Sequence, residues 1–347
     1  MSWLLLLLGF AVLVVGGELL VRGASALSER MGISPMVVGV TVVAIGSSLP
    51  ELAVGIDAAL RGNTGLVTGN IVGTNIVNLL LILGISATLR PILTGRQMMR
   101  LDLPMVAVVA ALLFLLSLGG SLSWPAGIVL IVVGIVYTVL ILWYTRRTKA
   151  QEMSRRAQEF RVGHQDGYQV GQQLTVDTPD SAQDAPQPAN RPGWLPLLRD
   201  IAYLAGGIAL VIVGADLLVS GAVDIATALG ISDTLVGLTV VAVGTSAPEL
   251  VTSVVATIRG QASMAVGNLI GSSVYNVVFI LGLTIVVAPD AIPVPAEVLY
   301  VDMLVMAAVS LLVVLLFRTG RRITRKEGIV LVLLYAAYLT YLLLART

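Results

Sequence analysis

The sequence predicts an all-α integral membrane protein in which ten transmembrane helices form two inverted five-helix repeats. Composition is the first reason, because 57% of the 347 residues are hydrophobic, 12% are charged and the mean hydropathy is +0.95. Soluble domains are typically about 45–50% apolar and about 25% charged. Internal duplication is the second reason, because residues 39–52, GVTVVAIGSSLPEL, recur as residues 237–250, GLTVVAVGTSAPEL. Such a chain is expected to cross a membrane many times and to carry one structural unit twice.

Ten apolar segments are long enough to cross a bilayer, which takes about 20 residues of helix. They lie at residues 2–22, 37–60, 65–87, 103–119, 124–145, 196–220, 235–258, 264–288, 298–317 and 326–344. The first segment has no basic leading region, so we expect a spanning helix there and not a cleavable signal peptide.

A polar stretch between the fifth and sixth segments is rich in Gln, Asp, Pro and Arg, a composition typical of a disordered linker. The expected organisation is a first five-helix half at 1–146, a linker at 147–195 and a second half at 196–347. His164, the only histidine, lies in this linker, and cysteine is absent. Disulfides and thiolate metal sites are therefore excluded. We expect no cofactor, no enzyme activity, no nucleic-acid binding and no protein partner.

The basic residues predict the orientation, because Lys and Arg concentrate in cytoplasmic loops. With both termini outside, nineteen of the twenty-one Lys and Arg residues fall on the cytoplasmic side, and only Arg61 and Arg346 fall outside. Five helices in each half then require the halves to lie upside down relative to one another, as in many secondary transporters. We expect a multi-pass protein of the inner (cytoplasmic) membrane with its long linker in the cytoplasm.

The duplicated region places one glutamate inside an apolar helix of each half. Residues 32–84 align with residues 230–282 at a constant separation of 198, with 24 identities in 53 positions that include Gly, Pro, Glu and Asn. The two glutamates are Glu51 and Glu249. Membrane-buried acids are rare and usually functional, so the duplication indicates a repeated site and not only repeated hydrophobicity.

The residue before each glutamate is a proline, which has no amide hydrogen and leaves a carbonyl one turn earlier without its helical donor. Hydroxyl residues stand three or four positions before the glutamates and are expected to share a face with them. These residues are Ser47, Ser48, Thr245 and Ser246. Carboxylate, hydroxyl and carbonyl oxygens are the ligands of hard cations such as calcium, sodium and magnesium. The alternative is a proline kink whose hydroxyls bond back to their own helix.

The next helix of each half carries the pattern G-N-x-x-G-[TS]-x-x-x-N. Its residues are Gly69, Asn70, Gly73, Thr74 and Asn78 in the first half and Gly267, Asn268, Gly271, Ser272 and Asn276 in the second. Glycines four residues apart let another helix approach closely, and ordinary helix packing is one explanation of the pattern. The hydroxyl and the last amide lie one turn apart on one face, where they can complete an oxygen cage.

The paired G-[ST]-S-x-P-E and G-N-x-x-G-[ST] segments resemble the two alpha repeats of the cation/calcium antiporter superfamily, in particular its prokaryotic sodium/calcium exchanger branch. The resemblance covers the whole ten-helix layout. It implies a central calcium site shared by Glu51 and Glu249, and sliding of the first and sixth helices past the others. It also implies adjacent sodium sites, whose ligands match Ala44, Ser47 and Thr74 in one repeat, Ala242, Thr245 and Ser272 in the other, and Asn78 near the middle position.

One position departs from the resemblance. Several sodium/calcium members carry an aspartate near the end of the second repeat's motif, where this chain has Asn276. The pocket is therefore expected to hold two carboxylates, which balance one divalent ion, two sodium ions or two protons. Three sodium ions would leave a net positive charge in a low-dielectric site, which is costly. Asn276, Ser48 and Ser246 complete the candidate ligand set.

The predicted function is secondary active antiport of calcium against sodium by alternating access, with the bilayer and the two ions as the only partners. The nearest alternative is a proton-coupled exchanger of calcium or another divalent cation. A passive cation channel is an alternative of a different class, although a single buried acidic pair between two pseudo-symmetric halves favours a carrier. An intramembrane aspartyl protease would need two facing aspartates, and this chain offers glutamates beside prolines.

Two acidic residues outside the motif occupy equivalent positions in the first and sixth helices. Glu18 and Asp216 can attract cations to the two mouths of a pathway. An ion pair with Arg22, four residues later, explains Glu18 equally well.

Three further acids are not expected to bind ions. Asp57 has Val255 at its equivalent position and lies well around the helix from Glu51. Asp102 and Asp302 fall near predicted helix ends, where we expect them to be solvated at the membrane interface.

Overall fold

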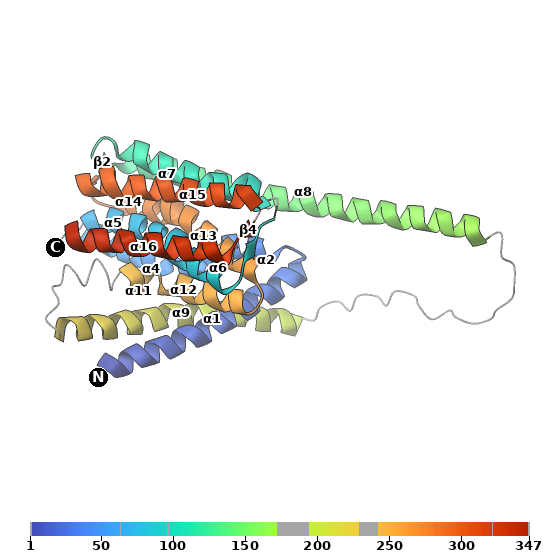
Figure 1. Cartoon of the computed structure of the whole chain (residues 1–347), viewed down its shortest axis with the longest axis horizontal. Coiled ribbons are helices and arrows are strands. Elements are labelled where there is room, and N and C mark those ends of the chain that lie inside the picture. Colours follow the sequence, from blue (N-terminus) through green and yellow to red (C-terminus); the bar gives the residue numbers. More distant parts are fainter. Residues whose placement is uncertain are drawn as a thin grey trace.

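The computed structural model describes residues 2–62, 64–95, 97–171, 194–228, 242–320 and 322–345. Long helices dominate these ranges and form one bundle (Figure 1). Within them, nine helices are long and apolar enough to cross a membrane, which confirms nine of the ten predicted spans. The seventh predicted span is described only from residue 242, and its expected start at 235 lies outside the described residues.

The helices of the two halves follow the same order. The first half contains α1 (Ser2–Met31), α2 (Pro35–Val38), η1 (Gly39–Val43), α3 (Ala44–Ser47), α4 (Leu49–Leu60), α5 (Thr64–Ile76), η2 (Val77–Ile82), α6 (Leu83–Leu89), η3 (Met98–Asp102), α7 (Leu103–Ser117) and α8 (Trp124–Gly171). The second half contains α9 (Trp194–Ala228), α11 (Ala242–Thr245), α12 (Ala247–Ile258), α13 (Ala262–Tyr275), η5 (Asn276–Leu281), α14 (Gly282–Val287), η6 (Val298–Asp302), α15 (Met303–Gly320) and α16 (Arg325–Ala345). The segments labelled η are π-helical turns, which are frequent at functional sites.

Two short antiparallel ribbons confirm that the halves are inverted. Strand β1 (Ile92–Leu93) of the first half pairs with β4 (Arg322–Ile323) of the second, and β2 (Ser121–Leu122) pairs with β3 (Ile292–Pro293). The labels of β2 and β4 stand at opposite ends of the bundle in Figure 1. Strands β1 and β3 follow the third helix of their halves, so equivalent parts of the two halves lie at opposite ends.

Helices α1 and α9 pack mainly on each other, along one side of the bundle (Figure 1). Glycines at every seventh position allow the close approach; they are Gly9, Gly16 and Gly23 in α1 and Gly207, Gly214 and Gly221 in α9. A Cβ atom on Gly16 would lie 2.7 Å from the backbone nitrogen of Val211. Among the described residues, the main hydrophobic core contains none from α1 or α9, so this pair forms a unit beside the core.

Helix α8 corrects the prediction for the linker. It continues without a break from the membrane span to Gly171 and projects far beyond the bundle (Figure 1). The expectation of disorder from residue 147 is therefore wrong up to residue 171, while residues 172–193 lie outside the described residues. The segment 146–171 contains no proline and holds five Arg and four Gln, which favour helix. Because it extends an existing helix, it needs no new nucleation step.

Candidate cation site

The two proline segments break their helices at equivalent residues. Ser48 separates α3 from α4 with φ −89° and ψ 7°, and Ser246 separates α11 from α12 with φ −83° and ψ 1°. Each proline lies in the first turn of the following helix, where the missing amide hydrogen costs no helical hydrogen bond. The sequence predicted a proline-altered helix, and the structure shows two half-helices that meet at a serine.

The break places each glutamate in the first turn of a new helix. Glu51 lies in the first turn of α4 and Glu249 in the first turn of α12, and both side chains are fully buried. The two carboxyl groups, one from each repeat, interact with each other electrostatically. The positive end of each helix dipole favours the charged form of the carboxylate it carries, while burial disfavours it. A bound cation relieves both the burial and the mutual repulsion.

Hydroxyl groups of the first repeat contact residues of the second. The Oγ of Ser48 donates to Oε1 of Glu249 over 3.3 Å, and the Oγ of Ser47 donates to Oδ1 of Asn268 over 3.3 Å. Both serines are buried. These two hydroxyls, on either side of the helix break, thus link the two repeats.

Helix α13 also reaches across to the first repeat. The Oγ of Ser272 donates to the carbonyl oxygen of Ala44 over 3.4 Å. A Cβ atom on Gly271 would lie 2.4 Å from the carbonyl oxygen of Val40, so only glycine permits this approach. Ser272 of the second repeat and Ser47 of the first thus share the carbonyl oxygen of Ala44 as an acceptor.

Many buried polar atoms in this region have no protein partner. Among the described residues, fifteen buried side-chain nitrogen or oxygen atoms lack a hydrogen bond, and eight of them belong to the predicted ligand set. The eight are both carboxylate oxygens of Glu51, Oε2 of Glu249, Oγ1 of Thr74 and both amide atoms of Asn78 and Asn276. Native proteins leave few such atoms unpaired, and oxygen-rich cages of this kind suit sodium and calcium.

The charge of the region comes from two carboxylates. The described residues contain no group of three or more His, Cys, Asp or Glu side chains that could hold a metal ion. Asn276, the residue that departs from the resemblance, is fully buried at the start of the π-helical segment η5. Asn78 is likewise buried, in the π-helical segment η2. Neutral oxygens therefore supply the rest of the ligand set.

Two asparagines of the G-N-x-x-G motif support the site from outside the predicted ligand set. Asn268 accepts from Ser47, and Oδ1 of Asn70 accepts from Thr245 Oγ1 over 3.4 Å. Each asparagine therefore binds a hydroxyl of the opposite repeat. The motif contained both residues, but its spacing gave no sign that they bind the hydroxyls of the broken helix. The side chain of Ala242 lies outside the described residues.

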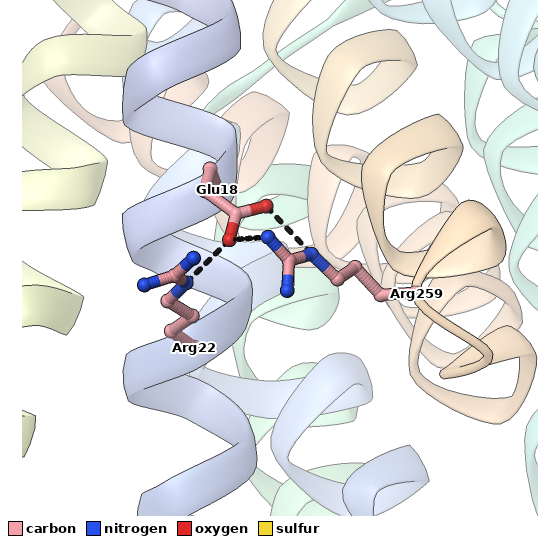
Figure 2. Close-up of polar contacts among 3 residues, drawn as sticks. All are labelled: Glu18, Arg22 and Arg259. Carbon is pink, nitrogen blue, oxygen red and sulfur yellow. Dashed lines mark hydrogen bonds and ion pairs between the residues drawn. The ribbon is translucent and has the colours of Figure 1, made fainter.

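Glu18 forms ion pairs and is not a free carboxylate at the entrance of a cation pathway. It accepts from Arg22 on its own helix and from Arg259 at the end of α12 (Figure 2). The Nε of Arg259 lies 2.8 Å from Oε2 of Glu18. Arg61 is the first-half equivalent of Arg259, and it pairs with Asp57 over 2.8 Å. Asp216 is the second-half equivalent of Glu18; it is exposed and has no ion pair within the described part of the chain. The ion-pair interpretation of Glu18 is confirmed, and Asp57 is exposed and paired with Arg61.

The expectation for Asp102 and Asp302 is wrong, because both side chains are buried. Asp102 accepts from the hydroxyl of Tyr137 over 3.0 Å, and Asp302 accepts from the hydroxyl of Tyr338 over 2.8 Å. Each aspartate is the last residue of a π-helical segment, η3 or η6, that precedes a spanning helix. The tyrosine hydroxyls replace the water that we expected at a membrane interface.

Comparison with known proteins agrees with this architecture. The family model described as sodium/calcium exchanger protein matches residues 1–143 and 200–344. The chain is 34% identical to the sodium/calcium exchanger MaX1 of Methanosarcina acetivorans over 98% of both chains, and 33% identical to the putative antiporter CaxA of Alkalimonas amylolytica over 96% of this chain and 95% of that protein. A solved structure of the sodium–calcium exchanger NCX_Mj superposes with a TM-score of 0.77 at 28% identity and covers 98% of both chains. The chain therefore belongs to the sodium/calcium exchanger protein family.

Proposed function

We propose that this chain exchanges calcium for sodium at one site formed by Glu51, Glu249 and the neutral oxygens around them. The observation that carries the proposal is the group of eight buried, unpartnered polar atoms on predicted ligands of both repeats. Each such atom costs about 1–3 kcal/mol when it is buried without a partner. Six of the eight atoms are oxygens, and a cation that binds them removes their share of that cost. MaX1 and NCX_Mj are named as sodium/calcium exchangers, which supports calcium and sodium as the two ions.

The two carboxylates set the charge that the site can carry. One calcium ion or two sodium ions balance Glu51 and Glu249, and a third sodium ion would leave an uncompensated charge in a low-dielectric pocket. With Asn276 in place of an acid, we expect one calcium ion to exchange for two sodium ions. The doubly negative site without ions is too costly to cross the membrane, which couples the two fluxes.

We propose that alternating access uses the α1–α9 pair. These two helices pack on each other through their seven-residue glycine spacing, and the main core contains none of their described residues. Two smaller buried clusters join the pair to the neighbouring helices. Sliding of the pair would shift these smaller clusters and leave the main core packed, while the half-helices that carry the glutamates stay in place. This motion would expose the same ligands first to one side of the membrane and then to the other.

We also propose the orientation given by the basic residues. Figure 1 draws both chain ends at one end of the bundle and the projecting part of α8 at the other. With most of the Lys and Arg residues on the side of α8, that side is the cytoplasm. The chain would then lie in the inner membrane with both termini outside and residues 147–195 in the cytoplasm.

Protons are the second candidate for the counter-ion. Two buried carboxyl groups can release two protons when calcium binds, and within the described part of the chain no third carboxylate joins them in one metal-binding group to favour an additional sodium ion. Calcium uptake by proteoliposomes under a sodium gradient, or under a pH gradient without sodium, separates the two. Sodium-driven uptake that saturates with calcium supports the proposal. Uptake driven only by the pH gradient supports proton exchange, and unsaturable, uncoupled flux indicates a channel.

A further inference from the structure

We infer that Asn268 is a positioning residue that turns the hydroxyl of Ser47 toward a bound cation, and that Thr252 fixes Asn268 in the required orientation. The inference rests on the proposed ligand role of Ser47. It concerns residues outside the predicted ligand set, and it makes the two halves of the site unequal.

The direction of the Asn268 amide follows from Thr252. The Oγ1 of Thr252 lies 2.8 Å from the carbonyl oxygen of Pro248 and 3.2 Å from that of Glu249. Carbonyl oxygens only accept hydrogen bonds, so the single proton of the Thr252 hydroxyl points toward them. The lone pairs of its oxygen can then accept a hydrogen bond from another donor. The side-chain nitrogen of Asn268 lies 3.1 Å from this Oγ1 and donates to it. A further acceptor, Ser253 Oγ, lies 3.2 Å from the same nitrogen.

With its nitrogen fixed on Thr252, Asn268 must present its oxygen to Ser47. The separation between Ser47 Oγ and Asn268 Oδ1 is 3.3 Å. Because Oδ1 only accepts, the Ser47 proton points toward it, and the lone pairs of Oγ remain for a cation. The carbonyl of Ala44, 3.4 Å from Ser47 Oγ, and the carboxylate of Glu249 are the other acceptors within reach of this hydroxyl. Both are proposed ligands, so a proton aimed at either would oppose a bound cation.

The first repeat has no described side chain that fixes its asparagine as Thr252 fixes Asn268. Asn70 accepts from Thr245 over 3.4 Å, but its side-chain nitrogen has no hydrogen-bond partner among the described residues. The positions equivalent to Thr252 and Ser253 are Val54 and Gly55. Neither side chain can accept a hydrogen bond, so nothing there decides which amide atom of Asn70 faces Thr245. Within the described part of the chain, the amide of Asn268 is therefore held in one orientation and the amide of Asn70 is not.

Nearly isosteric substitutions test this difference. Thr252→Val removes the hydroxyl that accepts from Asn268, with little change of volume, and Thr252→Ser keeps it. Val54→Thr adds a hydroxyl at the equivalent position of the first repeat, beside Asn70. Gly55→Ser is avoided, because its Cβ would lie 2.9 Å from Thr284 Oγ1. Groups that orient metal ligands typically change affinity by about 10- to 100-fold when they are removed.

The experiment uses the full chain and two readouts. Reconstituted vesicles give the maximal rate and the half-saturating sodium and calcium concentrations. Thermal stability of the detergent-solubilised protein, titrated with sodium chloride or calcium chloride, gives cation binding without transport. We expect Thr252→Val to raise the half-saturating concentration of at least one cation about tenfold, with a maximal rate within about twofold of wild type. Thr252→Ser should restore wild-type values, and Val54→Thr should lower the same concentration.

Two results would overturn the inference. One is wild-type cation binding in Thr252→Val by both readouts. The other is a loss of stability without added ions, or of maximal rate, while cation affinity is unchanged, since this marks a purely structural role for Thr252. If the wild-type protein binds cations in the stability assay but does not exchange calcium for sodium, the proposed function fails, and the stability titration of the three variants still decides the inference.

Discussion

At the scale of single residues, Asn276 decides how much charge the site carries. It is buried in η5, and both of its amide atoms lack a protein partner. Asn276→Asp would add a third carboxylate beside Glu51 and Glu249, and we expect a third sodium ion to balance it. The sodium dependence of calcium uptake should become steeper, with a Hill coefficient that rises from about two toward three, and transport should begin to respond to membrane potential.

Uptake at imposed potassium-diffusion potentials measures this change. Asn78→Asp is the companion variant, because Asn78 occupies the equivalent position in the first repeat, and a third carboxylate there should have the same effect. Identical sodium and voltage dependence in Asn276→Asp and wild type would contradict a role for this position in charge balance.

The sequence predicted the charged residues of the site better than the neutral ones that orient them. Glu51 and Glu249 stood out because a buried charge in an apolar helix demands an explanation. The link from Thr252 through Asn268 to Ser47 could not be predicted, since it depends on which side chains of α12 and α13 meet across a helix interface. Asp102 was misjudged for the same reason, because its tyrosine partner lies on a separate helix, 35 residues away in sequence.

At the scale of elements, the glycines between α1 and α9 give a sharp test of close packing. A Cβ atom on Gly207 would lie 2.4 Å from the backbone nitrogen of Leu20, whereas one on the neighbouring Gly206 meets nothing within 4 Å. We expect Gly207→Ala to lower the thermal stability and to reduce exchange several-fold, because backbone cannot move aside as a side chain can. Gly206→Ala should leave both unchanged or slightly raise stability, since alanine favours helix. Equal behaviour of the two variants would contradict the packing described for this pair.

The Glu18–Arg259 ion pair joins α1 to the end of α12, and it has a counterpart that is arranged differently. Arg61 holds Asp57 on its own helix, whereas Val255 at the position equivalent to Asp57 leaves Arg259 for Glu18. If α1 moves relative to α12, breaking this tether should change how far apart the two helices lie. We expect Glu18→Gln to broaden the distance distribution and to change the turnover of exchange, with the apparent calcium affinity unchanged.

The absence of cysteine makes this measurement direct. Spin labels on cysteines placed at Val15 and Ile258, both exposed, report the α1–α12 distance by pulsed electron paramagnetic resonance. Asp57→Asn is the control, because it removes a surface ion pair within a single helix. Superimposable distributions in Glu18→Gln and wild type would show that the ion pair does not restrain α1.

Spanning helices were predictable because apolar length alone marks them. The π-helical turns, the strand pairs and the continuation of α8 were not, since each depends on which neighbour a segment meets or on a helix that is already formed. Only part of the helix break at the serine could be predicted. The proline predicted a disturbed helix, but only the structure showed that the hydroxyls beside it contact the opposite repeat.

At the scale of the whole molecule, the inverted repeat explains why one site forms from two distant segments. The halves are related so that β1 pairs with β4 and β2 with β3, and the same relation brings Ser48 of one half to Glu249 of the other. In the proposed site neither half is complete, because each would supply one carboxylate and hydroxyls that contact the other half. Inversion would make such a site approachable from either side of the membrane through equivalent elements, as the proposed alternating access requires.

The most direct test of this account is sodium-driven calcium uptake into vesicles that contain wild type, Glu51→Gln, Glu249→Gln or Asp57→Asn, with protein orientation and amount matched. Each glutamine variant leaves one carboxylate to balance a divalent ion in a buried pocket, so we expect uptake to fall at least about 100-fold in both, the range that loss of a few kcal/mol produces. Asp57→Asn, on the same helix as Glu51 but exposed, should transport like wild type. Wild-type uptake in either glutamine variant would contradict a single site shared by the two repeats.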